Sequence, residues 1–502
     1  MEKKTKKKSI FIGALLMVIV VLVALSMIPG KSILNSNRGG VSYQCSDGQD
    51  NDGDGYCDFA GCEIGKGKNK VVLDPDPDCE SAEDDDESSG VCIPTDCSAL
   101  GYNCGVWDDG CGGQLICGQN CSEGYICLSG QCVLPPSGDI YYVSTSGDDN
   151  NDGLTEQTPW KTLQYAESHA TAPGSIIALK RGDNWASATA LGIQHGGTPE
   201  EPITWDGDLW GPIGDTKAII SNTQDRGQND PASIVTIANC DNVIFQNIVI
   251  DGNSNYAFGG LVIGGNPWQA SGLYQNDESN IVVQGCEIRE VGGRRDYSLC
   301  LLVQTWNNDM SNITIRNNNV HDCATWGISV YMGKASEGAV PSTYHDLYIG
   351  YNTVTNCQKA RGDDGPNIGL SGGIMNAVVE HNTITQGSYA PNSGLDTASD
   401  PESGFSPQGV VFQYNDVRMN DVPAFLAQNG GAQQVIVHDN YLYTGNPGNE
   451  ATVRLFPADY TGARFHFYDN TISSDGGLCY ADSSGQVILS ANNTFIPASC
   501  GP

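Results

Sequence analysis

Basic residues are scarce in this chain. Its 502 residues include 25 Lys and Arg against 59 Asp and Glu, so the formal net charge is −34, and ten of the 25 bases lie before residue 71. A nucleic-acid-binding protein needs a basic surface to neutralise phosphates, so we expect no nucleic-acid partner. The same charge repels acidic polysaccharides unless calcium bridges the two sets of carboxylates. A polysaccharide ligand would therefore be neutral or bound with a metal.

The chain also lacks any Cys-x-x-Cys pair, and its first histidine is His169. Structural zinc sites use closely spaced thiolate and imidazole ligands, so we expect no zinc among the cysteines. Twelve of the 19 cysteines lie between Cys45 and Cys132, which indicates a disulfide-rich, exported region. Eight of them define a module at 92–132, in which we expect four disulfides whose connectivity the sequence does not assign. These cysteines are Cys92, Cys97, Cys104, Cys111, Cys117, Cys121, Cys127 and Cys132.

A glutamate is missing where an EF-hand loop would need one. Residues 45–79 hold aspartates at positions 1, 3, 5 and 9 of such a loop, but position 12 is Gly61. The segment resembles the Asp-rich calcium repeats of thrombospondin type 3 and dockerin modules, which implies Ca²⁺ ligands at Asp50, Asp52, Asp54 and Asp58. The alternative is an acidic spacer held by disulfides. Residues 80–91 are expected to be a solvated acidic linker.

The long apolar run of the chain extends from Ile10 to Ile28 and follows five lysines. Its 19 residues would span about 28 Å as a helix, close to the thickness of a bilayer core. The ALSMIPG segment is a poor cleavage site, so we interpret residues 1–30 as a basic cytoplasmic tail and an uncleaved anchor, with a cleaved signal peptide as the alternative. Because the lysines keep the N-terminus cytoplasmic, we expect a single-pass protein of the cell membrane whose bulk is extracellular, or a secreted one if cleavage occurs.

Asparagine recurs in the second half of the chain with the period of a structural repeat. Each interval, of 34, 30, 33, 25, 30 and 23 residues, holds three short strands and their turns, so successive coils stack as a solenoid. The Asn side chain suits the turn and can hydrogen-bond the Asn of the next coil. An antiparallel sandwich of short strands would not produce such a ladder. The seven residues are Asn318, Asn352, Asn382, Asn415, Asn440, Asn470 and Asn493.

Residues 138–166 contain a first strand, an Asp/Asn/Gly loop, a Pro-Trp-Lys-Thr turn and a short amphipathic helix. Together with the coils, this segment resembles the right-handed parallel β-helix of pectate lyases and polygalacturonases, over residues 139–502. The resemblance implies that the helix covers the open end of the core. The predicted fold class is therefore all-β: a right-handed parallel β-helix preceded by small disulfide-rich modules and an N-terminal transmembrane helix.

Seven cysteines lie within the coils. Cys323 and Cys357 each fall five residues after a ladder Asn, so they stack on neighbouring coils in a geometry that permits a disulfide. Cys479 and Cys500 are expected to join the last coil. At least one thiol must stay free or pair elsewhere among the other three, Cys240, Cys286 and Cys300.

Alternation in the strand before each ladder segment sorts its side chains into two faces. In GLDTA (394–398), Leu395 and Thr397 point inward, so Asp396 lies on the outer face. Aspartate is disfavoured in strands, and its presence there invites a functional explanation. The neighbouring strands are expected to place further polar side chains on the same surface: Gln304, Tyr331, Ser371, Gln428 and Arg454.

Two long connections, 358–367 and 396–408, flank this surface. Their charged residues include Lys359, Arg361, Asp363, Asp364, Asp400 and Glu402. The ARGDDG segment resembles the GDDG segment of family 9 pectate lyases, which implies that Asp363 and Asp364 bind a catalytic Ca²⁺. Those lyases take the proton with a lysine farther along the helix, whereas Lys359 is the last lysine here. The alternative is that GDDG only forms a turn.

Two reactions remain open at this stage. In β-elimination, Ca²⁺ held by Asp363, Asp364 and Asp396 would neutralise a uronate carboxylate and acidify the adjacent C–H. The candidate bases are Arg361, Arg454 and Lys359. In hydrolysis, two of the four residues Asp363, Asp364, Asp396 and Asp400 would act as acid and base, because residues one or two coils apart are separated by about 5 or 10 Å. The Asp-Asp pair is not followed by the Gly-His-Gly of polygalacturonases.

The family resemblance implies an enzyme that processes a polysaccharide, either a lyase or a glycoside hydrolase, and the expected anchor would hold it on the outside of the cell membrane. The rival hypothesis is a non-catalytic surface adhesin that binds glycans on a disulfide-rich stalk. The fold alone cannot choose between them. A buried carboxylate cluster beside a groove would favour chemistry, and a flat face with exposed aromatic residues would favour binding.

Overall fold

The computed structural model describes most of residues 137–500, with its longest gaps at 265–277, 333–342 and 456–464, and short segments between 62 and 133. The chain forms two units, Met1–Pro94 and Thr95–Pro502. In the first unit, strands β1 (Cys62–Ile64) and β2 (Val71–Leu73) pair antiparallel. The proposed calcium ligands Asp50, Asp52, Asp54 and Asp58 lie outside the described residues.

The expected membrane anchor at residues 1–30 also lies outside the described residues and stays a prediction. None of the helices that the structure describes has the length and apolar character needed to cross a bilayer.

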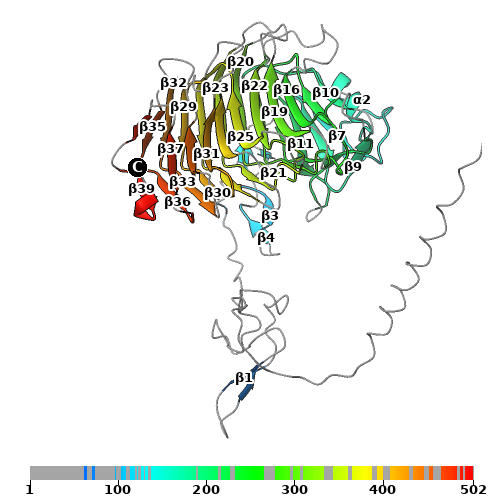
Figure 1. Cartoon of the computed structure of the whole chain (residues 1–502). Helices are drawn as coiled ribbons and strands as arrows, with labels where there is room; N and C mark the ends of the chain where they lie inside the picture. Colours follow the sequence, from blue (N-terminus) through cyan, green and yellow to red (C-terminus); the bar gives the residue numbers. More distant parts are fainter. Residues whose placement is uncertain are drawn as a thin grey trace, which may run out of the picture. The chain divides into compact units, whose positions relative to one another are not determined.

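The second unit contains three parallel sheets (Figure 1). Sheet 1 consists of β7 (Ile140–Val143), β8 (Ile176–Lys180), β11 (Ile203–Trp210), β14 (Val243–Gln246), β17 (Glu278–Gln284), β20 (Met310–Arg316), β23 (Tyr344–Gly350), β26 (Ile374–Glu380), β29 (Gln408–Gln413), β32 (Gln433–His438), β35 (Phe465–Tyr468) and β38 (Val487–Leu489). Sheet 2 consists of β9 (Asn184–Ser187), β12 (Ile219–Asn222), β15 (Val249–Asp251), β18 (Glu287–Arg289), β21 (Asn319–His321), β24 (Thr353–Thr355), β27 (Thr383–Thr385), β30 (Asp416–Asn420), β33 (Tyr441–Gly445), β36 (Thr471–Ser474) and β39 (Thr494–Ile496). Sheet 3 consists of β10 (Leu191–Ile193), β13 (Val235–Ile237), β16 (Gly259–Gly264), β19 (Leu299–Thr305), β22 (Ile328–Met332), β25 (Pro366–Ser371), β28 (Ser393–Ala398), β31 (Phe425–Gln428), β34 (Val453–Leu455) and β37 (Tyr480–Asp482).

The chain visits sheets 1, 2 and 3 in turn, so each strand pairs in parallel with the strand one coil later. Equivalent apolar residues therefore stack in columns, as Ile315, Ile349 and Val379 do in sheet 1. All three are fully buried in one continuous core. The solenoid predicted from the asparagine period is confirmed.

The asparagine ladder forms where sheet 1 turns into sheet 2. The Nδ2 group of Asn352 donates to Oδ1 of Asn382 over 3.0 Å, and Asn382 donates to Asn415 over 2.9 Å. Each Oδ1 also accepts the backbone N–H of the preceding ladder Asn. The bonds continue from Asn318 to Asn493. A residue with positive φ, such as Tyr351 (φ 58°), precedes each ladder Asn from Asn318 to Asn470 and makes the tight turn.

Helix α2 (Leu163–His169) follows the first strand, as predicted. Its N-cap Thr162 accepts the N–H of Tyr165, and Leu163 and Ala166 pack into the core. Asp149 accepts the N–H groups of Lys161 and Thr162, which holds the preceding acidic loop as a closed turn.

The eight-cysteine module contains two short hairpins, β3 (Val106–Asp108) with β4 (Gln114–Ile116), and β5 (Ile126–Leu128) with β6 (Gln131–Val133). Two of its disulfides are Cys97–Cys117 and Cys121–Cys132, and Cys104 is also disulfide-bonded.

The pairing of the cysteines in the β-helix differs from the prediction at one disulfide. Cys479 and Cys500 form the predicted disulfide. Cys323, however, bonds to Cys300 and not to Cys357, which remains a buried thiol with its Sγ 2.8 Å from the Sγ of Cys323. Three sulfur atoms meet at this corner, and β19 brings Cys300 to Cys323 from the preceding strand of sheet 3, which the five-residue spacing did not reveal. Cys240 and Cys286 are free and buried.

We expect this corner to re-pair when Cys300 is removed. In Cys300→Ser, oxidation should join Cys323 to Cys357 because their sulfur atoms are already in contact. Peptide mapping of the non-reduced protein should show a Cys300–Cys323 peptide in the wild type and a Cys323–Cys357 peptide in the variant. The Cys479–Cys500 peptide is the internal control for oxidation. Free thiols at both Cys323 and Cys357 in the variant, with that control disulfide intact, would contradict the expectation.

Candidate functional site

The outer face of sheet 3 carries the candidate site. The strand register places Ser329, Gly369, Asp396, Leu426 and Arg454 in one outward row along five successive coils. A second row joins Gln304, Tyr331, Ser371, Ala398 and Gln428. The polar residues expected on one surface are thus neighbours on the same sheet.

Asp396 is the central carboxylate of this face. Its residue is only 4% exposed although it belongs to the outward row, and its Oδ2 accepts a hydrogen bond of 2.6 Å from Nε2 of Gln428 in the next coil. Burial makes a charged carboxylate costly, and carboxyl groups in such environments gather at functional sites, so Asp396 is a candidate functional group. Arg454 lies two coils farther along the row, about 10 Å away at the usual strand spacing.

The coils before Asp396 carry an apolar patch on the same face. Phe258, Val262, Leu299 and Leu302 form a small buried cluster of their own, against which Trp326 and Tyr331 pack. The indole of Trp326 lies over Gly365, where a Cβ would come within 1.5 Å of its ring. Gly365 therefore leaves the space that the indole occupies. The face of sheet 3 combines an apolar and aromatic half with a polar half around Asp396.

Lys359 does not lie where a catalytic base beside Asp396 would have to lie. Its Nζ pairs with Glu290 over 2.6 Å and lies 3.9 Å from Asp322, and the residue is 8% exposed. Glu290 and Asp322 follow β18 and β21, which belong to earlier coils, whereas Asp396 belongs to a later coil. The ammonium group thus points away from Asp396.

The other candidates cannot be placed. Arg361, Asp363, Asp364 and Asp400 lie outside the described residues, so their proposed roles stay predictions.

A charged network that the sequence did not reveal lies on sheet 2. Glu287 accepts from Arg289 over 2.5 Å and contacts Nε2 of His321 over 3.3 Å, while Nδ1 of His321 lies 2.7 Å from Asp322. Arg289 also pairs with Asp251 over 3.0 Å. The hydrogen bond with His321 is the main cause that lowers the pKa of Glu287 to about 2, and Glu287 in turn raises the pKa of His321. Acids and bases compensate each other here, so we interpret the network as structural.

This network predicts an optimum of stability in mildly acidic solution. The contribution of Glu287 is present above its ordinary pKa of 4.5 and is lost as the pH falls toward 2. The contribution of His321 is present below its ordinary pKa of 6.5 and is lost as the pH rises through its raised value. Both act between about 4.5 and 6.5.

We therefore expect His321→Gln to lower the free energy of unfolding by about 1 kcal/mol near pH 5.5 and by less at pH 9. Urea unfolding at both pH values measures this difference. His169→Gln, at an exposed histidine outside the network, is the control. An equal loss at both pH values would show that the imidazolium charge is irrelevant.

Aromatic and imidazole rings line the corner between sheets 1 and 2. Tyr351 stacks on His381 with ring centroids 4.6 Å apart, His381 stacks on Tyr414 at 5.0 Å, and His438 stacks on Tyr468 at 4.7 Å. Tyr351 and Tyr414 are 53% and 48% exposed. Stacking occupies the faces of most of these rings, so the stripe presents ring edges and hydroxyl groups to solvent.

Comparison with known proteins agrees with this architecture. Residues 303–495 match a family model described as a right handed beta helix region. A solved GH136 lacto-N-biosidase from Eubacterium ramulus superposes with a TM-score of 0.50 and 16% identity, over 71% of this chain and 68% of that one. The described residues between 140 and 500 form a right-handed parallel β-helix.

Other similarities to the β-helix protein are shorter or more distant. Pectate lyase Pel9A has a TM-score of 0.40 and 13% identity, over 71% of this chain and 77% of the lyase. The Bacillus subtilis protein YwoF, which is uncharacterised, is 38% identical over 69 residues. That match spans 14% of this chain and 14% of YwoF, so the chain covers about a seventh of this curated relative.

Proposed function

We propose that the β-helix binds a glycan along the outer face of sheet 3 and cleaves it, with Asp396 as the acid–base group. The observation that carries this proposal is the 4% exposure of Asp396 in an outward row, together with its hydrogen bond to Gln428. General acid–base catalysis needs a titratable group held at a fixed position beside the scissile bond. The amide of Gln428 holds one carboxylate oxygen in place, and Trp326 and Tyr331 supply aromatic surface on the same face.

Hydrolysis fits this arrangement better than β-elimination. Lys359 is turned toward Glu290, so among the candidate bases only Arg454 is described on the Asp396 row. An arginine would need a strongly lowered pKa to take a proton. An aspartate can act directly as an acid or base in glycoside hydrolysis. The same fold in the lacto-N-biosidase of Eubacterium ramulus shows that a β-helix is able to host such chemistry.

The proposed hydrolysis does not require Ca²⁺. Oδ2 of Asp396 accepts an amide N–H, and carboxylates that bind metals are commonly hydrogen-bonded as well, so this bond is compatible with either an acid–base or a ligand role. Asp363 and Asp364 would hold Ca²⁺ if the site uses it, and the ion would then neutralise a carboxylate of an acidic glycan. Calcium at Asp50, Asp52, Asp54 and Asp58 remains a separate proposal.

The disulfides support an extracellular location. Cys300–Cys323 and Cys479–Cys500 close the β-helix, and Cys97–Cys117 and Cys121–Cys132 close the preceding module. Such bonds persist in oxidising compartments. We propose that residues 1–30 anchor the protein in the cell membrane and that the β-helix acts outside the cell on a surface or environmental glycan.

The test is to incubate the full-length protein with neutral, pectic and alginate glycans, with calcium and with chelator. We expect new reducing ends without unsaturated uronate absorbance, and no dependence on calcium. Unsaturated product that disappears with chelator would establish a lyase instead and would point to Asp363 and Asp364.

A non-catalytic glycan-binding adhesin is the second candidate. The exposed stripe that contains Tyr351, His381 and Tyr414 favours it, because aromatic edges and hydroxyl groups on a flat corner suit binding. Binding without product from a folded protein in the same panel would support the adhesin.

A further inference from the structure

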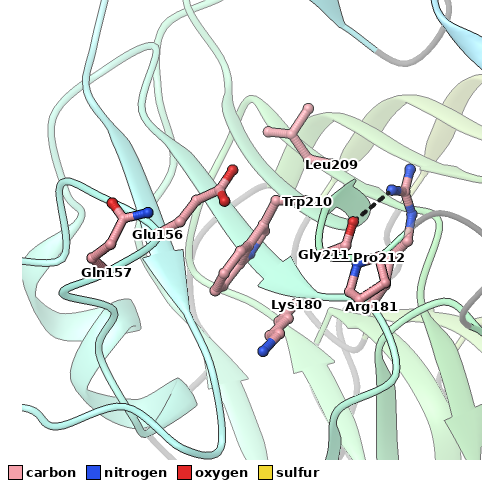
Figure 2. A pocket seen from close by; sticks show the side chains of 8 residues that line it. All are labelled: Glu156, Gln157, Lys180, Arg181, Leu209, Trp210, Gly211 and Pro212. Atoms are coloured by element: carbon pink, nitrogen blue, oxygen red, sulfur yellow. Dashed lines mark hydrogen bonds between the residues drawn. The ribbon is translucent and has the colours of Figure 1, made fainter.

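A pocket of about 530 Å³ opens beside the first coils of the β-helix (Figure 2). It is lined by Glu156, Gln157, Lys180, Arg181, Leu209, Trp210, Gly211 and Pro212. Lys180 ends β8 and Trp210 ends β11, both in sheet 1. Five coils separate β11 from β26, the sheet 1 strand of the coil that carries Asp396, or about 24 Å along the axis. The pocket is thus distinct from the site on sheet 3.

An irregularity in β11 builds this pocket. Asp206 pairs with Ala178, but Trp210 pairs with Lys180, so β11 uses four residues where β8 uses two. The two extra residues shift the register, so that Trp210 and not Asp208 pairs with Lys180. Trp210 is then anchored by a hydrogen bond of 2.8 Å from Nε1 to the carbonyl of Ala178 and by an edge contact with Tyr142, whose ring centroid is 5.3 Å away. The indole forms a rigid wall of the pocket.

The two basic side chains beside this wall, Arg181 and Lys180, differ in their partners. Arg181 is engaged by Asp208 and donates to the carbonyl of Gly211 over 3.4 Å, which is the dashed line in Figure 2. The ammonium of Lys180 lies 5.5 Å from the centroid of the Trp210 ring and has no ion pair with a carboxylate in the described part of the chain. In Figure 2 the indole lies between this ammonium and the carboxylate of Glu156. Within the described residues, this acidic chain, with a net charge of −34, thus holds in the pocket a cation that forms no ion pair.

We propose that this pocket binds a hexuronate residue of an acidic glycan, with the sugar carboxylate on Lys180. The pocket matches each part of such a sugar. Glu156 and Gln157 are exposed and can accept hydrogen bonds from hydroxyl groups, while Leu209, Pro212 and the indole cover C–H groups. Lys180 supplies a local positive charge at this pocket, so a sugar carboxylate can bind here without a bridging metal although the chain as a whole is acidic. The inference rests on the proposed function in one respect, namely that the ligand is a glycan.

The test is calorimetric titration of the full-length protein, in chelator, with trigalacturonate and with trimannuronate. We expect one of the two to bind, and its carboxyl-reduced neutral counterpart to bind at least about tenfold more weakly, since a charge-assisted hydrogen bond contributes about that much. Lys180→Gln should weaken binding of the acidic trisaccharide by a similar factor. Lys161→Gln removes the same charge from an exposed lysine nearby and should leave binding unchanged.

Asp396→Asn separates this site from the catalytic one. We expect Asp396→Asn to bind the acidic trisaccharide as tightly as the wild type. This binding result can be interpreted even if the wild type cleaves no glycan. The proposal is overturned if the wild type binds neither trisaccharide or if Lys180→Gln binds as tightly as the wild type. It is also overturned if Asp396→Asn abolishes binding that Lys180→Gln retains, because the ligand would then lie on sheet 3.

Discussion

Asp396→Asn is expected to lower the rate of glycan cleavage by at least about a hundredfold and by up to ten-thousandfold, the range that general acid–base catalysis contributes. The substitution keeps the shape of the side chain and an oxygen that can accept the hydrogen bond from Gln428. It removes the titratable proton. The loss should therefore appear in kcat, with KM and the free energy of unfolding close to those of the wild type. Release of reducing ends measures the rate.

Two further variants sharpen that result. Asp346→Asn changes an exposed aspartate of β23 in sheet 1 and should leave the rate unchanged. Gln428→Ala should lower kcat less than Asp396→Asn, because it removes only the group that positions the carboxylate. Full activity in a folded Asp396→Asn protein would exclude Asp396 as the acid–base group.

Asn382→Ala is expected to lower the free energy of unfolding by about 3 kcal/mol or more. Its Oδ1 accepts two bonds of 3.0 Å, from the backbone N–H and from Nδ2 of Asn352, and its Nδ2 donates to the carbonyl of Ile349. Asn382→Ala would remove the side chain to which these buried groups bond. Each buried group left unsatisfied lowers the free energy of unfolding by about 1–3 kcal/mol. Urea unfolding measures the change.

The control for the ladder is Asn420→Ala. Asn420 is an exposed residue of β30 outside the ladder, and such substitutions usually change stability by less than about 0.5 kcal/mol. Similar losses for both variants would mean that the ladder bonds add no net stability beyond that of an ordinary side chain.

The position of Asp396 could be predicted from sequence, but its environment could not. Alternation between Leu395 and Thr397 placed its side chain on the outer face because side chains alternate in a strand. Its burial and its bond to Gln428 depend on a residue 32 positions away. The same limit applies to Lys359, whose partner Glu290 is 69 residues distant. Only the alignment of coils brings such residues together.

The sequence by itself determined the architecture of this protein. The asparagine period, the alternation of apolar residues, the capping helix and the Cys479–Cys500 bond all depend on patterns that recur at short or regular spacing. The tertiary structure decided which side chains meet across coils. The Cys300–Cys323 bond, the Glu287 and His321 network, and the pocket at Lys180 and Trp210 depend on turn lengths and on the irregularity in β11. Because these lengths vary from coil to coil, residue spacing alone does not specify the contacts.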